Sequence, residues 1–90
     1  MLKELKNKLK ITWDDEDENL LNSIEAGKAS INSMVGFKIN YDEDIEAKEL
    51  LLNYCRYSYN NAVEYFEGNF ESVILRLQLN YAVLKNEKNE

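Results

Sequence analysis

Residues 45–66 carry an apolar pattern with helical spacing that covers most of a helix's circumference. Two ridges, the second at heptad spacing, together span an arc of roughly 220° at 100° per residue. The first ridge is Ala47, Leu50, Leu51, Tyr54, Ser58, Ala62 and Tyr65, and the second is Ile45, Leu52, Tyr59 and Phe66, with Val63 beside it. A helix this apolar is either central to its domain or covered by a second chain, and the pattern leaves both alternatives open.

Helical spacing continues on both sides of this segment, and the chain has no proline and only three glycines to interrupt it. Both facts favour long helices over a turn-rich β fold. The pattern predicts three helices before residue 68. The first spans residues 2–9, and the second runs from an N-cap at Thr12 to a stop at Gly36. A loop at 37–43 follows. The third helix begins at Asp42 or Asp44 and continues to about Glu67, with Gly68 as its stop.

Gly27 lies inside the apolar stripe of the second predicted helix. The rest of that stripe is Leu20, Leu21, Ile24, Ile31, Met34 and Val35. A missing side chain within an apolar stripe lets another backbone or side chain approach closely. We therefore expect a second helix to pack against Gly27.

Residues 70–84 satisfy two patterns at once. Helical spacing is shown by Phe70, Val73, Ile74, Leu77, Tyr81 and Leu84. The alternation expected of a half-buried strand is shown by Leu75, Leu77, Leu79, Tyr81 and Val83, each separated from the next by one other residue. We favour a helix to about Leu79 and leave the remainder open, with residues from about 80 to 90 as a polar, flexible tail. The sequence thus predicts one all-α domain over 1–90, a small bundle of three to four helices with a long central third helix.

The charge balance disfavours a nucleic-acid reader. The chain has 17 acidic and 11 basic residues, for a net charge of −6, whereas contact with phosphates requires a basic patch. Cys55 is the single cysteine, which excludes an internal disulfide and suits a reducing compartment. The N-terminus has no apolar core of a secretory signal, and we expect no membrane association.

The residue inventory gives no support for catalysis, and we expect no catalytic, cofactor-binding or metal site. The chain has no histidine, and Cys55 inside the third predicted helix is best interpreted as a small apolar residue. Asp42, Asp44 and Glu46 have the first spacings of a calcium loop, but Ala47 stands where that loop needs glycine. Carboxylates at helix starts are explained by the helix dipole. We therefore expect that the protein is not an enzyme and needs no cofactor.

Binding to other protein chains is the better interpretation of the apolar excess. Tyrosine is enriched at protein interfaces because its ring is apolar and its tip polar. The candidate subunit or partner interface comprises Ile45, Leu52, Tyr59, Val63, Phe66, Leu75, Leu79 and Tyr81.

Three stretches, taken in order, resemble the head–tail connector (adaptor) proteins of long-tailed bacteriophages. The first, LKELKNKLKITWDDEDENLLNSIEAGKASINSMVG, has a short leucine helix, an acidic turn and a helix with an Ala26-Gly27 pair and a terminal glycine. The second is AKELLLNYCRYSYNNAVEYFEGNF, similar to the family's long third helix, and the third is FESVILRLQL, similar to the closing segment of short members from phages of Gram-positive bacteria. The resemblance covers most of the chain.

The resemblance implies a virion structural protein rather than an enzyme. Such adaptors assemble as a ring on the portal, usually with dodecameric symmetry, extend the DNA channel and dock the stopper or tail. The implied partners are therefore the portal protein, the stopper or tail-completion protein and further copies of the chain, while DNA passes through without sequence-specific binding. The implied location is the head–tail interface of the virion, after a stage in the host cytoplasm.

An acidic channel lining repels DNA phosphates and lets the genome slide. The candidate channel-facing acids are Asp14, Asp15, Asp17, Asp42, Asp44 and Glu49. The alternative function is a small acidic inhibitor that mimics DNA and blocks a nucleic-acid-binding protein. That alternative requires carboxylates spaced along one exposed face, whereas here they cluster near predicted helix starts.

Overall fold

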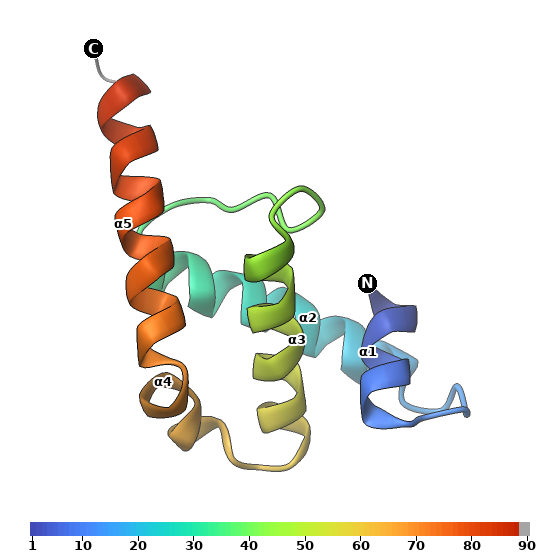
Figure 1. Ribbon diagram of the computed structural model, residues 1–90. Helices are drawn as coiled ribbons and strands as arrows, with labels where there is room; N and C mark the ends of the chain where they lie inside the picture. Colours follow the sequence, from blue (N-terminus) through green and yellow to red (C-terminus); the bar gives the residue numbers. More distant parts are fainter. Residues whose placement is uncertain (89–90) are drawn as a thin grey trace.

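The computed structural model describes residues 1–88, and all regular elements in that range are helices, joined by short connections (Figure 1). The elements are α1 (Leu2–Leu9), α2 (Asp17–Val35), α3 (Ile45–Tyr59), a 3₁₀ turn η1 (Val63–Tyr65), α4 (Phe66–Asn69) and α5 (Glu71–Lys88). The expected small all-α bundle is confirmed. α2 passes behind α3 in this view, while α1 and α5 lie on opposite flanks.

α3 is the central helix, because its side chains enter the core on several faces. Ala47, Leu50, Leu51, Leu52 and Cys55 are all buried. Core residues from the other helices surround them, and these are Leu5, Leu20, Ile24, Ile31, Val35, Phe66, Ile74 and Leu77. The wide apolar arc of residues 45–59 is therefore largely explained by burial within the chain's own core.

α3 packs closely against Gly27 of α2, as the sequence predicts. A Cβ atom at Gly27 would lie 2.7 Å from Cδ1 of Leu51 and 3.0 Å from Cδ1 of Tyr54. Leu51 has no exposed surface, so its side chain has little room to move aside. The Tyr54 hydroxyl also lies 3.3 Å from the Ser30 hydroxyl, which ties the same two helices together.

α2 begins at Asp17, so the predicted N-cap at Thr12 is wrong. Ile11 is buried with 5% of its surface exposed, and it anchors the segment that follows α1 in the core. Lys6 Nζ then lies 2.7 Å from carboxylate oxygens of both Asp14 and Asp17, which folds residues 10–16 into a turn beside α1. Helix formation therefore starts only after this turn is complete.

The connection between α2 and α3 has the expected position. Gly36 ends α2 with φ +79°, the left-handed conformation that glycine adopts without a Cβ clash. Asp44 is the N-cap of α3, since its Oδ1 accepts a hydrogen bond of 2.9 Å from the Ala47 amide.

α3 ends at Tyr59, so the prediction that the third helix continues to Glu67 is wrong. Asn61 adopts a left-handed φ of 56°, a conformation that asparagine tolerates better than most residues. The turn that follows brings Phe66 back against α3, with its ring centroid 5.0 Å from that of Tyr54. Phe66 is 1% exposed there, whereas a straight helix would carry it away from the core. Gly68 lies within α4 and is not the predicted stop.

α5 settles the ambiguous C-terminal segment as a helix. Its inner face buries Ile74 and Leu77, and Gln78 Nε2 donates a hydrogen bond of 2.8 Å to the Met34 carbonyl at the end of α2. The helix continues to Lys88, beyond Leu79, after which the sequence leaves the conformation open, and residues 89–90 of the predicted flexible tail lie outside the described range. The strand alternative is therefore wrong.

We expect Gly27→Ala to lower the free energy of unfolding by about 1–3 kcal/mol, because the added methyl overpacks the contact with Leu51 and Tyr54. Gly68→Ala is the matched control, since no atom lies within 4 Å of a Cβ placed there. That control should be neutral or stabilising by up to about 1 kcal/mol. Urea unfolding of the two variants measures both effects, and equal stability of Gly27→Ala and wild type would show that the helices can separate without cost.

Candidate docking surfaces

The chain is less compact than a self-contained domain of its size. Its radius of gyration is 13.8 Å, against about 12 Å expected for 90 residues. Its accessible surface is 6081 Å², roughly 600 Å² above the about 5,500 Å² expected for a 10.6 kDa monomer. Figure 1 shows one reason, since the distal half of α5 projects beyond the other helices.

The outer face of α5 is an unpartnered apolar stripe. Leu75, Leu79 and Val83 follow one another at four-residue spacing and are 53%, 61% and 57% exposed. We call these three residues the α5 stripe. They lie on a different side of the helix from Ile74 and Leu77, so α5 is apolar on both its inner and outer faces. A helix of that kind buries only one of its faces within this chain.

The structure divides the interface residues predicted from the sequence into three groups. Leu52 and Phe66 are buried in the chain's own core at 4% and 1% exposure, so their assignment to an interface is corrected. Tyr81 is partly buried and packs against the core. The exposed members are Ile45, Tyr59, Val63, Leu75 and Leu79, of which Ile45 is the most exposed at 79%.

A second exposed cluster, of which the sequence predicted only Tyr59 as an interface residue, surrounds Glu16. One carboxylate oxygen of Glu16 accepts hydrogen bonds from the Trp13 indole nitrogen at 2.7 Å and from the Tyr59 hydroxyl at 3.0 Å. Both rings remain 40% or more exposed, so their polar atoms are satisfied while their apolar faces stay open. We call Trp13, Glu16 and Tyr59 the Glu16 patch. The available sequence signal was a lone tryptophan in an otherwise polar segment.

The six candidate channel acids come from three segments of the chain. Asp14, Asp15 and Asp17 lie in or just after the turn before α2, Asp42 and Asp44 in the loop before α3, and Glu49 on α3 itself. Lys6 binds Asp14 and Asp17, and its hydrogen bond lowers the pKa of the Asp14 carboxyl. Glu49 lies 3.6 Å from Lys8, while Asp15 and Asp42 are exposed. Several of these charges therefore have intramolecular partners.

Tyr81 fastens α5 to the loop between α2 and α3. Its hydroxyl donates a hydrogen bond to Asp44 Oδ2, and its ring centroid lies 4.7 Å from that of Phe37. Beside these contacts is an open hollow of about 630 Å³, which Ile45 and Leu84 also line. Burial and the Asp44 contact raise the pKa of Tyr81 to about 12.

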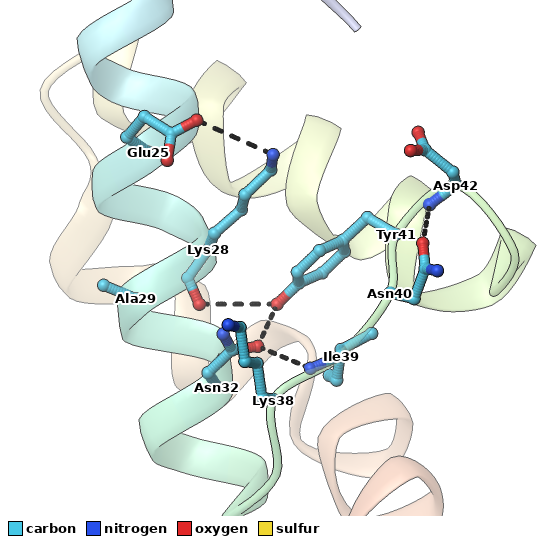
Figure 2. Close-up of a pocket in the computed structure, with 9 residues that line it drawn as sticks. All are labelled: Glu25, Lys28, Ala29, Asn32, Lys38, Ile39, Asn40, Tyr41 and Asp42. Carbon is cyan, nitrogen blue, oxygen red and sulfur yellow. Dashed lines mark hydrogen bonds and ion pairs between the residues drawn. The ribbon is translucent and has the colours of Figure 1, made fainter.

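A polar hollow between α2 and this loop is lined by residues that internal hydrogen bonds hold in place (Figure 2). The Tyr41 hydroxyl donates to Asn32 Oδ1 at 2.8 Å, and the same oxygen accepts from the Ile39 amide at 3.2 Å. Tyr41 is 4% exposed, and its burial raises the pKa of its hydroxyl. These bonds fix the loop against α2 and so position Asp44 for both α3 and Tyr81.

Cys55 is placed as the sequence predicts. It is 1% exposed in the centre of α3, and burial raises the pKa of its thiol to about 11. Because the thiolate is the reactive form, Cys55 is a packing residue with low reactivity at neutral pH.

We expect the free energy of unfolding to fall between about pH 10 and pH 12, partly because of Tyr81. In the unfolded chain tyrosine ionises near its ordinary value of 10.0, whereas folded Tyr81 keeps its proton to about 12, so raising the pH favours unfolding in this range. Tyr81→Phe should make that fall shallower, and Tyr65→Phe, at an exposed tyrosine, serves as the control. Chemical unfolding at several pH values measures the slopes, and identical slopes in Tyr81→Phe and wild type would contradict the assignment.

Comparison with known proteins identifies the family. The family model described as phage gp6-like head-tail connector protein matches residues 1–88. No curated protein and no solved structure matched the chain. Within residues 1–88, none of the helices combines the length and apolar character needed to cross a membrane. The match spans nearly the whole sequence, and the chain therefore belongs to the gp6-like head–tail connector family, whose members are structural proteins of phage virions.

Proposed function

We propose that this protein is an adaptor that assembles as a ring on the phage portal, extends the DNA channel and docks the stopper or tail. The observation that carries the proposal is the family match over residues 1–88. Membership implies association with portal and tail proteins at the head–tail interface of the virion. We further propose that the ring is dodecameric, following the symmetry of the portal. Before assembly the protein is present in the host cytoplasm.

The surface of the chain supports an assembly role. A ring built from one kind of subunit is a heterologous assembly, in which each copy uses two different patches. The α5 stripe and the Glu16 patch are two such exposed regions, and they come from opposite flanks of the fold (Figure 1).

The alternative of a DNA-mimicking inhibitor has weaker support. Such a protein presents unpaired carboxylates at regular spacing along one face. Here Asp14 and Asp17 are both bound by Lys6, Glu4 by Lys48, and Glu46 by Arg76. These pairs reduce the free negative charge on several elements, so the acidic composition alone does not produce a phosphate-like row.

The test is the mass of the purified chain, measured by light scattering with and without the portal protein of the same phage or prophage. We expect a closed ring on the portal that matches its subunit number, whether or not the free chain is monomeric. A chain that stays monomeric at all concentrations and does not associate with the portal would contradict the adaptor function. Bovine serum albumin in place of the portal controls for non-specific association.

The channel assignment gives a separate prediction. We propose that part of the acidic charge in Asp14–Glu18 and Asp42–Glu49 lines the DNA channel, where it repels phosphates and keeps the genome mobile. Electron cryo-microscopy of the portal-bound ring should place some of these carboxylates, with the exposed Asp15 and Asp42 as the best candidates, on the inner wall. A ring with all of them on its outer rim would contradict this assignment and leave the adaptor function intact.

A further inference from the structure

We infer that copies of this chain exchange α1, so that α1 of one subunit docks on α2 and α3 of the next subunit in the ring. The inference rests on the proposed function, which brings copies side by side, and it adds the element that links them. Three features of the molecule support it: the way α1 is held, the backbone conformation of Lys10, and the division of charge between α1 and the rest of the chain.

α1 is held by one buried side chain and a set of ion pairs. Leu5 is fully buried, while Leu2 and Leu9 are only partly buried. The ion pairs are Lys6 with Asp14 and Asp17, Lys8 with Glu49, and Glu4 with Lys48. Exposed ion pairs are weak because water competes for both charges. Since α2 buries five residues and α1 only one, α1 separates from the core at a lower cost than α2 does.

The chain is strained where it turns back after α1. Lys10 has φ 60° and ψ 39°, which is the left-handed conformation, although its side chain is one for which that conformation is unfavourable. Glycine usually occupies this position at the end of a helix. Opening of the turn at Lys10 releases the strain, and short hinges under strain favour the exchange of an element between copies.

The residues after Lys10 have contacts of their own with the remainder of the fold. Ile11 is 5% exposed in the core, and the Glu16 carboxylate accepts a hydrogen bond of 3.0 Å from the Tyr59 hydroxyl of α3. The hinge is therefore confined to Lys10, and rotation there moves α1 while residues 11–16 stay on their own subunit. α1 lies at one flank of the fold, where a neighbouring subunit has access to it (Figure 1).

The charge of α1 is opposite to that of the rest of the chain. The first ten residues contain four lysines and one glutamate, whereas the remaining 80 contain 7 basic and 16 acidic residues. α1 of one copy is therefore attracted to the body of another, although the whole chains carry the same net charge. A second copy is the occupant that we assign to this surface, because it offers the same helix with the same ion-pair partners.

Exchange is expected on the portal rather than in the free chain. In a free chain, α1 of the same molecule is present at a high effective concentration and occupies the surface first. In the proposed ring, neighbouring copies are held side by side, so this advantage is lost. The exchanged helix makes in the neighbour the contacts that it made at home, and the strain at Lys10 then favours exchange.

Cross-linking across a native ion pair tests the exchange. The double variant Lys8→Cys/Glu49→Cys places two thiols where side chains 3.6 Å apart meet, and a short bismaleimide replaces the length that these side chains lose. In the free chain we expect an internal cross-link and the mass of one subunit. In the assembled ring we expect cross-links between subunits, seen as a ladder of masses on a denaturing gel. Cys55 is buried, so the wild type serves as the background control.

The two ways of failing are distinguishable. A ring on the portal that yields only internally cross-linked single subunits would overturn the exchange and leave the adaptor function intact. Absence of any ring would overturn both.

Variants of the hinge give an independent measurement. Lys10→Gly removes the strain of the closed turn and should lower the fraction of cross-links between subunits about fivefold or more. Lys10→Val increases that strain and should produce cross-linked pairs even without the portal. Lys38→Gly is the matched control, an exposed lysine in the loop after α2 that lacks a positive φ, and it should change the fraction less than about twofold. Circular dichroism checks that each variant remains helical, and equal cross-linking between subunits in Lys10→Gly and wild type would overturn the inference.

Discussion

The contact between α2 and α3 at Gly27 determines how the remaining elements are placed. Because no side chain separates the helices there, Leu51 and Tyr54 lie directly against α2. Tyr54 then presents its ring to Phe66, at 5.0 Å and nearly perpendicular, which is a favoured geometry for aromatic pairs. Phe66 in turn stacks on Phe70, the residue directly before α5. The direction in which α5 leaves the core therefore depends, through two aromatic contacts, on a missing side chain in α2.

Polar contacts set the position of the segments that the core does not hold. Lys6 forms ion pairs with Asp14 and Asp17. The Asp44 carboxylate at the start of α3 accepts a hydrogen bond from Tyr81, and the Asn32 side chain accepts one from Tyr41 in the loop between α2 and α3. Exposed ion pairs contribute little to stability, typically about 0–1 kcal/mol each. Their effect here is geometric, because they fix a turn and a loop that display the exposed side chains. The same core thus supports two surfaces on opposite flanks.

The sequence predicted most of the helices and the Gly27 contact, because both follow from the spacing of apolar residues. α1, the end of α2 at Gly36, and the central place of α3 are examples. The errors have a shared cause, since each depends on a contact between residues distant in the chain. Helical periodicity runs past Tyr59 and through Asn61 without a break, and only the packing of Phe66 on Tyr54 shows why α3 ends at Tyr59. Tyr59 was predicted as an interface residue, but its neighbours Trp13 and Glu16 were missed because only folding brings them to Tyr59.

Trp13 gives the chain an internal optical reporter. It is the single tryptophan, 48% exposed, with its indole nitrogen already bonded to Glu16. Its fluorescence therefore comes from one known place, free of overlap with a second indole. Loss of solvent from that ring shifts the emission to shorter wavelength, so contact with any partner at this flank is visible in real time without an attached dye. Because the Glu16 hydrogen bond holds this one indole in a known position, the rate of assembly can be followed by stopped-flow fluorescence.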